Sequence, residues 1–124
     1  MAEWIFTEEA VIAAARERTG LEDFGGDEFR EGLRVLLETY ATTAGLSERG
    51  RKLNWERVVE LLATRLRVQA AHRRHPEIRK RGIAKPMFLT GLPRSGTSAL
   101  FNLLAEDPAA RPLRLWEGLH PDPL

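Results

Sequence analysis

One short segment limits what this chain can fold into: the apolar run at residues 87–90, which lies between Pro86 and Gly91. A run this short and this apolar is typical of a parallel strand that is buried on both faces. Parallel strands occur in sheets of several strands with both faces covered. This run begins at residue 86 of a 124-residue chain, which leaves room for a β-α-β unit at most. We therefore expect the front part of a larger α/β protein.

The residues that follow the apolar run predict a turn, a helix and a second strand. Residues 91–96 have the composition of a tight turn. Residues 97–106 predict a helix that ends at Asp107, and its expected buried side is Leu100, Leu103 and Leu104. Residues 111–117 predict a second short strand. The region from residue 86 to residue 124 is thus expected to be the incomplete start of an α/β domain.

Before residue 86 the sequence predicts an N-terminal helical segment, residues 1–85, with about three helices over residues 7–75. A capping residue begins each helix, and a glycine or a proline follows it. The capping residues are Thr7, Asp27 and Ser47, and the terminators are Gly20, Gly45 and Pro76. Apolar residues recur at helical spacing: Ile5, Val11, Ile12 and Ala15; then Phe29, Leu33, Leu36 or Leu37, and Tyr40; then Trp55, Val58, Val59, Leu62 and Leu66.

Composition excludes several classes of protein. Hydrophobic residues are 43% and charged residues 30% of the chain, which is typical of a globular protein. No apolar run is long enough to span a membrane, and residues 1–4 do not begin a signal peptide, so we expect a cytoplasmic protein. The absence of cysteine excludes disulfides, cysteine-ligated zinc and a thiol nucleophile.

Residues 65–85 are rich in Lys and Arg, although the formal net charge of the whole chain is only +1. Such a run can attract an anionic partner, or it can be the solvated end of a helix whose dipole it complements. No aromatic residues interleave with these cations, so we expect the solvated helix end and no nucleic-acid partner. The histidines His72, His75 and His120 lack ligand spacing, so no metal is expected, and Trp4, Trp55 and Trp116 are expected in the core.

Residues 91–98 follow the frame G-x-x-x-x-G-x-S, which is a phosphate-binding loop with Thr97 in place of the usual Lys. The glycines allow the backbone to turn tightly and approach a ligand. Successive N–H groups and the N-terminus of the following helix favour an anion. Arg94 adds a bidentate cation, and Ser98 adds a hydroxyl beside that of Thr97. The frame therefore predicts an anion site, with a turn that binds nothing as the alternative.

The missing Lys bears on which anion is bound. In nucleotide-hydrolysing loops that Lys spans two phosphates, and the next hydroxyl residue holds Mg²⁺. Here the charge lies three residues earlier, on Arg94. This weakens the interpretation as a kinase or NTPase and favours a shorter anion that needs no metal.

The motif and the residues after it resemble the bacterial sulfotransferases that use 3′-phosphoadenosine 5′-phosphosulfate (PAPS). The likeness rests on residues 91–98 behind an apolar segment and on residues 103–108, 111–112 and 116–117, and the leader with residues 21–25 is similar too. It covers nearly all of this chain and the first part of the family's usual length. It implies a P-loop-type sulfotransferase fold of class α/β, here a helical segment followed by the first strand–phosphate loop–helix unit.

The resemblance also implies the chemistry of the loop. The residues expected to bind the 5′-phosphosulfate are Gly91, Leu92, Pro93, Arg94, Ser95, Gly96, Thr97 and Ser98. Arg94 matches the basic residue that stabilises charge on the bridging oxygen as the sulfuryl group leaves. Ala99 stands where cytosolic relatives often have Trp, and the 3′-phosphate contacts are expected beyond residue 124.

Glu117 is a second candidate catalytic residue. Some bacterial sulfotransferases take their general base from a glutamate shortly after the loop, and Glu117 matches that place. The alternative is a carboxylate that fixes its own loop beside Trp116.

These observations predict a PAPS-dependent transferase that moves a sulfuryl group to a small hydroxyl or amine acceptor, and a chain that is inactive alone. Two alternatives stay open: a fragment of a P-loop nucleotide kinase or NTPase, and a non-enzymatic helical interaction module. The sequence does not determine the oligomeric state.

Overall fold

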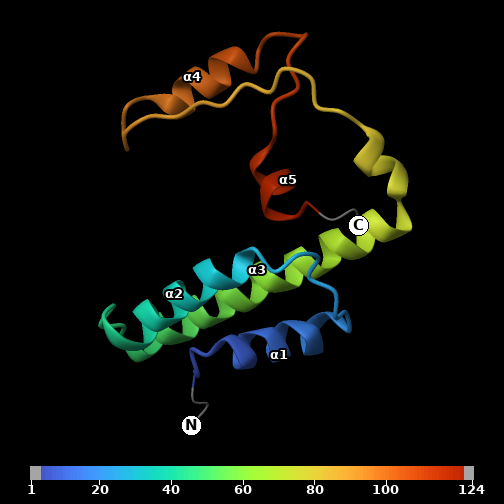
Figure 1. Cartoon of the computed structure of the whole chain (residues 1–124). Coiled ribbons are helices and arrows are strands. Elements are labelled where there is room, and N and C mark those ends of the chain that lie inside the picture. The colour runs from blue at the N-terminus through green and yellow to red at the C-terminus, as the bar shows by residue number, and fades with distance from the viewer. Residues whose placement is uncertain (1–3, 122–124) are drawn as a thin grey trace. The chain divides into compact units, whose positions relative to one another are not determined.

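The computed structural model describes residues 4–121, which form helices joined by loops (Figure 1). In chain order the helices are α1 (Glu8–Thr19), α2 (Phe29–Thr42), α3 (Glu48–Arg74), the 3₁₀ helix Pro76–Lys80, α4 (Thr97–Leu104) and α5 (Leu115–Leu119). The chain divides into two compact units, and the second is Glu77–Pro121. This division falls ahead of the expected domain boundary at residue 86. None of the helices in the described range is both long and apolar enough to cross a membrane.

The three expected helices of the first unit are confirmed, and two of the capping residues act as predicted. Thr7 Oγ1 accepts a hydrogen bond from the Ala10 N–H at 3.3 Å, and Ser47 Oγ accepts one from the Gly50 N–H at 3.2 Å. Gly20 ends α1 in the left-handed conformation, with φ of 67°. Asp27 differs, because α2 begins after Glu28, whose side chain makes no capping bond.

The core of the first unit lies where α1 packs against the long helix α3, with α2 also in contact with α1. Buried side chains line these faces, and each fully buried aliphatic side chain contributes about 1.5–3 kcal/mol of transfer free energy. They are Phe6, Val11, Ile12, Ala15, Phe24, Leu33, Leu37, Val58, Val59, Leu62 and Leu66. Trp4 and Trp55 pack against the core with ring centroids 5.3 Å apart. Ile5, which belongs to the apolar pattern of the first predicted helix, precedes α1 and is 48% exposed.

Arg65 on α3 fixes the connector between α1 and α2. Its Nε donates to the Phe24 carbonyl at 2.7 Å, and its Nη2 donates to the Gly26 carbonyl at 3.2 Å. The guanidinium also lies over the Phe29 ring, 4.5 Å from the centroid. These contacts satisfy carbonyl groups that a connector without secondary structure leaves free.

The second unit differs from the sequence prediction in its apolar segment. Residues 87–90 form no strand, and Met87 and Phe88 are 74% and 81% exposed. The prediction of a strand buried on both faces is therefore wrong for this chain. A strand exists only through hydrogen bonds to a neighbouring strand, and the described residues provide none.

Helix α4 forms after the loop as predicted, but its apolar side is not buried. Leu100, Leu103 and Leu104 are 46%, 70% and 37% exposed, since no sheet within the described residues covers them. Trp116, expected in the core, is 58% exposed.

Residues 115–119 form the helix α5, where a second strand was expected over residues 111–117. Glu117 explains the difference, because its carboxylate accepts a hydrogen bond from the Arg114 N–H at 2.7 Å. This bond satisfies a backbone N–H at the start of the helix that begins at Leu115.

Candidate functional site

The candidate site is the loop that joins the extended segment at residues 86–90 to α4. The Ser95 N–H donates to the Leu92 carbonyl at 3.2 Å, which closes a turn around Pro93 and Arg94. The backbone then enters α4 at Thr97, and the Leu100 N–H donates to the Gly96 carbonyl at 3.0 Å. The predicted loop-to-helix order is therefore present.

Two residues of the loop have positive φ angles: Arg94 at 62° and Gly96 at 86°. Ser95 between them and Thr97 after them have negative φ. Such alternation turns successive N–H groups toward one side and forms an anion-binding concavity. Arg94 lacks the freedom of glycine and adopts this conformation at a cost of order 1–3 kcal/mol. Strain of this kind is typical of residues held in place for a function.

Gly91 is favoured by close packing against two side chains of the loop. A Cβ atom at this position would lie 2.7 Å from Ser95 Oγ and 2.8 Å from Thr97 Cγ2. Both distances are too short for carbon contacts, so a side chain here displaces the hydroxyl residues of the loop. A Cβ at Gly96 meets nothing within 4 Å, so this glycine is favoured by its positive φ alone.

The N-terminus of α4 has no side-chain cap among the described residues. Its first N–H groups therefore have no partner within the helix, and its dipole favours a negative group in front of it. Arg94 and Ser98 are exposed and Thr97 is half-buried. The donor set thus consists of backbone N–H groups, three hydroxyls including that of Ser95, and one guanidinium. It suits an anion with several oxygens.

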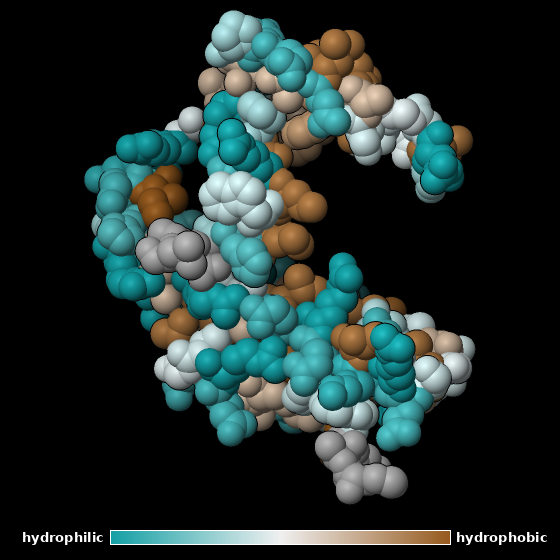
Figure 2. All heavy atoms as spheres, turned by 180° about the vertical axis from the view of Figure 1, so that it is seen from behind, coloured by the Kyte–Doolittle hydropathy of each residue, from teal (hydrophilic) through white to brown (hydrophobic). Residues whose placement is uncertain are grey.

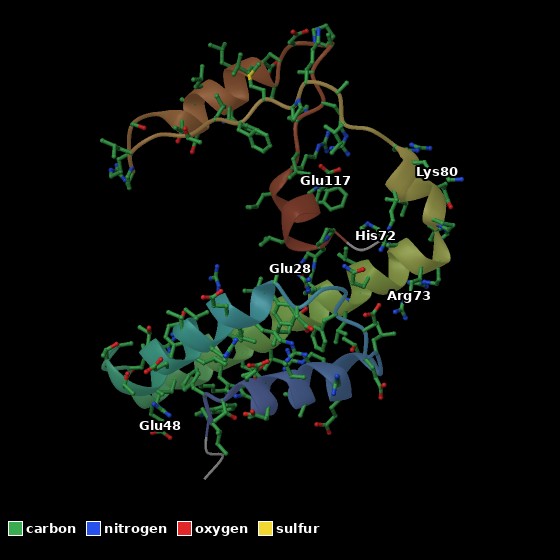
Figure 3. All side chains as sticks on the ribbon, in the orientation of Figure 1. Glu28, Glu48, His72, Arg73, Lys80 and Glu117 are labelled. Atoms are coloured by element: carbon green, nitrogen blue, oxygen red, sulfur yellow. The ribbon has the colours of Figure 1, made fainter. Side chains whose placement is uncertain are left out.

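Glu117 lies in the first turn of α5 (Figure 3). Its carboxylate accepts three hydrogen bonds: from Arg111 Nη1 at 3.2 Å, from Arg111 Nη2 at 2.7 Å and from the Arg114 N–H at 2.7 Å. The Arg111 guanidinium, and next the Arg114 N–H, hold the pKa of Glu117 below its ordinary value. These contacts favour the alternative in which Glu117 fixes its own loop, since a base of lowered pKa takes up a proton less readily.

Two solved structures are similar to this chain. One is the sulfotransferase STF1 of Mycobacterium tuberculosis, with 40% identity and a TM-score of 0.89 over 96% of this chain and 33% of that one. The other is the sulfotransferase STF9 of Mycobacterium avium, with 34% identity and a TM-score of 0.86 over 94% of this chain and 30% of that one. The chain is sulfotransferase-like. No protein-family model matches it, and no curated protein matches it either.

The sulfotransferase-like chain spans about a third of the length of the two structures it matches. The resemblance stated from the loop motif is thereby confirmed, and it extends to the helical leader, because the match covers nearly the whole chain. The roles of the individual loop residues and of Glu117 stay predictions.

The sequence prediction did not include Arg111 as a partner of Glu117. The two residues are six positions apart, whereas neighbouring side chains on one face are three or four positions apart in a helix and two apart in a strand. A sequence signal was present in Glu117 itself, because a glutamate at the third position of a helix is a common cap.

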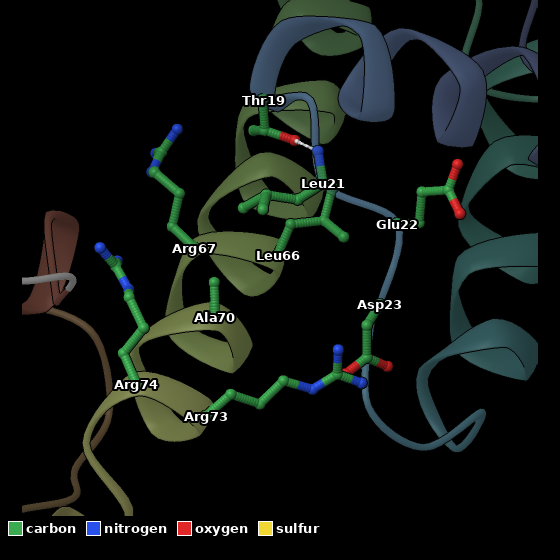
Figure 4. Close-up of a pocket in the computed structure, with 9 residues that line it drawn as sticks. All are labelled: Thr19, Leu21, Glu22, Asp23, Leu66, Arg67, Ala70, Arg73 and Arg74. Carbon is green, nitrogen blue, oxygen red and sulfur yellow. Dashed lines mark hydrogen bonds and ion pairs between the residues drawn. The ribbon is translucent and has the colours of Figure 1, made fainter.

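A hollow of about 630 Å³ lies in the first unit, between the end of α1 and the last turns of α3 (Figure 4). The residues that line it are Thr19, Leu21, Glu22, Asp23, Leu66, Arg67, Ala70, Arg73 and Arg74. Arg73 forms an ion pair with Asp23, and Arg67 Nη2 donates to Glu60 Oε1 at 2.6 Å. Since acids of the same unit neutralise these two cations, the hollow is not our candidate anion site. Within the described residues no cluster of three or more potential metal ligands occurs.

Proposed function

We propose that residues 91–98 bind the 5′-phosphosulfate end of PAPS and that the chain is the donor-binding part of a sulfotransferase. The observation that supports this proposal most directly is the loop geometry: positive φ at Arg94 and Gly96 leads into the uncapped N-terminus of α4. The similarity to STF1 and STF9, which are sulfotransferases, supports it independently.

The donor set fits such a group. A phosphosulfate presents several oxygens and negative charge at one end, and the loop contains N–H groups, hydroxyls and a bidentate cation, which are the donors that such a group requires. Thr97 replaces the Lys that a nucleotide triphosphate loop uses, so no residue here spans a longer phosphate chain. PAPS supplies a sulfuryl group on an activated anhydride bond.

In this proposal, different groups of the loop bind the anion and stabilise the charge that develops during transfer. The N–H groups at the start of α4 and the hydroxyls of Ser95, Thr97 and Ser98 bind and orient the anion. The Arg94 guanidinium stabilises the negative charge that develops on the bridging oxygen as the bond to sulfur breaks. The acceptor is a small molecule with a hydroxyl or amine group, and its proton leaves toward a base. Glu117 is not our candidate for that base, because its carboxylate already accepts two hydrogen bonds from the Arg111 guanidinium.

Binding of nucleotides to the full chain tests the proposal. The amide signals of residues 91–98 are followed by NMR during titration with PAPS, with its product PAP and with ATP plus Mg²⁺. We expect the loop signals to shift with PAPS and PAP in the absence of Mg²⁺. A shift that appears only with ATP and Mg²⁺ would instead indicate a nucleotide kinase or NTPase.

Two arginine variants make this experiment specific. Arg94→Ala removes the loop cation, and Arg81→Ala removes an exposed cation elsewhere in the second unit with the same change of net charge. The proposal expects weaker binding for Arg94→Ala alone. Equal weakening by both variants would mean that general electrostatic attraction, not the loop, holds the ligand.

A further inference from the structure

The hollow of the first unit combines apolar side chains with three arginines (Figure 4). All of its lining residues belong to this one unit, which has a buried core of its own. Leu21 and Ala70 line it and are half-buried, whereas Leu66 lines it from the core and is completely buried. Its volume of about 630 Å³ lies in the range of pockets that hold small organic molecules.

Two of the three arginines already have carboxylate partners, and the third does not. Arg73 forms an ion pair with Asp23, and Arg67 forms one with Glu60. Arg74 has no hydrogen-bond or ion-pair partner among residues 4–121. One guanidinium is therefore available to a ligand. The hollow suits a single negative charge, and not the multiply charged phosphosulfate that we assign to the loop.

The charged side chains around the hollow are separated in space. In Figure 4 the Arg67 and Arg74 side chains extend on one side of the hollow, and the Glu22 carboxylate extends on the opposite side. Arg73 instead reaches to Asp23. Arg67 and Arg74 lie two turns apart on α3, about 10 Å along its axis. An anionic group bound by Arg74 therefore lies away from Glu22, which would repel it.

Charged side chains cover much of the surface that Figure 2 shows, so an exposed arginine by itself indicates no site. Arg74 differs because it lines a hollow that also contains Leu21 and Ala70. The aliphatic part of an arginine packs along apolar groups while its guanidinium binds an oxyanion. This combination suits a ligand with an apolar body and one oxyanion at its end.

We propose that the hollow of the first unit is a binding site for an amphiphilic monoanion, a carboxylate or a sulfate ester on an apolar body. The Arg74 guanidinium binds the anionic group, and the apolar body covers Leu21 and Ala70. This proposal does not depend on which anion the loop at residues 91–98 binds.

Titration of the full chain with four probes tests the site. The amide signals of residues 19–23 and 66–74 are followed by NMR with octanoate, octyl sulfate, octyltrimethylammonium and inorganic sulfate, the three amphiphiles below their micelle concentrations. We expect saturable shifts with octanoate or octyl sulfate, and the anion that binds more tightly identifies the anionic group. Equal shifts with octyltrimethylammonium or with inorganic sulfate, or no shift with either octyl anion, would overturn the proposal.

Two arginine variants of α3 test the role of the charge. Arg74→Ala removes the guanidinium at the hollow, and Arg57→Ala removes an exposed one that does not line it. Arg74→Ala should weaken binding of the octyl anion about tenfold, the loss of a hydrogen bond to a charged group. Arg57→Ala should leave the affinity unchanged. Both side chains are exposed, so the helical circular dichroism signal should stay the same. Equal effects of the two variants on binding would contradict the site.

A second pair of variants tests the apolar part of the site. Ala70→Phe fills part of the hollow, and Ala13→Phe adds the same side chain at an exposed position of α1. Ala70→Phe should weaken binding of the octyl anion about tenfold, and Ala13→Phe should not. Undiminished binding in Ala70→Phe would overturn the proposal. If circular dichroism shows that Ala70→Phe does not fold, the comparison of Arg74→Ala with Arg57→Ala decides. Titration with PAP is recorded separately, so failure of this site and failure of donor binding are distinguishable.

Discussion

Arg111 binds Glu117 through two parallel hydrogen bonds, Nη1 to Oε2 at 3.2 Å and Nη2 to Oε1 at 2.7 Å. The same carboxylate accepts the Arg114 N–H, so a single side chain joins the segment before α5 to its first turn. This geometry gives Glu117 a role in fixing the chain at this point. A glutamate that acts as a general base needs a carboxylate free to take up a proton.

Replacement of Arg111 tests this relationship through the pKa of Glu117. The Arg111 guanidinium is the first cause that lowers this pKa below 4.5, so Arg111→Ala should raise it toward that value. The measurement is a pH titration of the Glu117 carboxyl carbon by NMR. Arg81→Ala serves as the control for net charge and should leave the titration unchanged. An unaltered Glu117 pKa in Arg111→Ala would mean that the ion pair does not form in solution.

Gly91→Ala should disturb the loop without affecting the helical unit. The new Cβ would lie 2.7 Å from Ser95 Oγ and 2.8 Å from Thr97 Cγ2, so both side chains must move. We expect the affinity for PAP to fall by about tenfold, equivalent to the loss of one or two hydrogen bonds. Gly82→Ala is the control, because a Cβ there meets nothing within 4 Å. Calorimetric titration measures the affinity, and unchanged binding in Gly91→Ala would exclude the loop as the site.

Arg94 should matter to sulfuryl transfer more than to folding. Arg94→Gly removes the guanidinium and retains the positive φ without strain, so it separates charge from backbone conformation. In a complete homologous protein with this loop, Arg94→Gly and Arg94→Ala should each lower the transfer rate about 10²–10³-fold. Arg94→Lys should retain part of the rate, because it keeps the charge and loses the bidentate fork.

The melting temperatures of these three variants provide the control. Arg94 is exposed and its removal leaves no cavity, so Arg94→Ala should cost on the order of 0.5 kcal/mol of stability. If Arg94→Ala unfolds the protein while the remaining folded fraction transfers sulfuryl at the normal rate, Arg94 is a structural residue.

Glu60 should make the stability of the helical unit depend on pH. It accepts hydrogen bonds from Arg67 at 2.6 Å and from Arg18 of α1 at 3.1 Å, and the Arg67 guanidinium is the first cause that lowers the pKa of Glu60. A lowered folded-state pKa adds stability above the ordinary value of 4.5, and this is lost as the pH falls through the folded-state value. Because Glu60 is 46% exposed, the contribution is about 0.5 kcal/mol.

Glu60→Gln should therefore lower the free energy of unfolding at pH 7 and have little effect at pH 2. Urea unfolding followed by circular dichroism at both pH values measures this difference. Glu17→Gln on α1 is the control, because the described residues give Glu17 no ion pair. Equal effects of Glu60→Gln at both pH values would contradict the assigned ion pairs.

The stability of the first unit should depend on the buried face of α3. Leu66 is completely buried, so Leu66→Ala should cost about 2–5 kcal/mol of unfolding free energy. Leu61→Ala, at a position of the same helix that is 61% exposed, should cost less than about 0.5 kcal/mol. Thermal unfolding of the helical signal compares the two. Similar costs would mean that the register of α3 differs from the one described.

The helices of the first unit could be predicted because their signals are local and their partners lie within the same stretch of chain. Thr7, Ser47 and Gly20 act through backbone groups a few residues away, and the apolar spacing of α3 needs only α1 and α2 beside it. The loop was predicted for the same reason, since a glycine-bounded turn into a helix is a local conformation.

Only the tertiary structure determines whether the apolar residues after residue 86 are buried or exposed. The short apolar run at residues 87–90 and the helical spacing of Leu103 predicted burial, and the structure leaves Met87, Phe88 and Leu103 exposed because burial requires a second surface. The helix at residues 115–119 is a different case, because the local hydrogen bond from the Arg114 N–H to the Glu117 carboxylate caps it and the apolar pattern does not encode that bond. Sequence by itself therefore determined which segments are apolar, where the helices of the first unit lie and where the loop turns into α4. Whether an apolar segment becomes a buried strand was decided by the presence of a neighbour, because strand pairing and burial are interactions between segments and not properties of one.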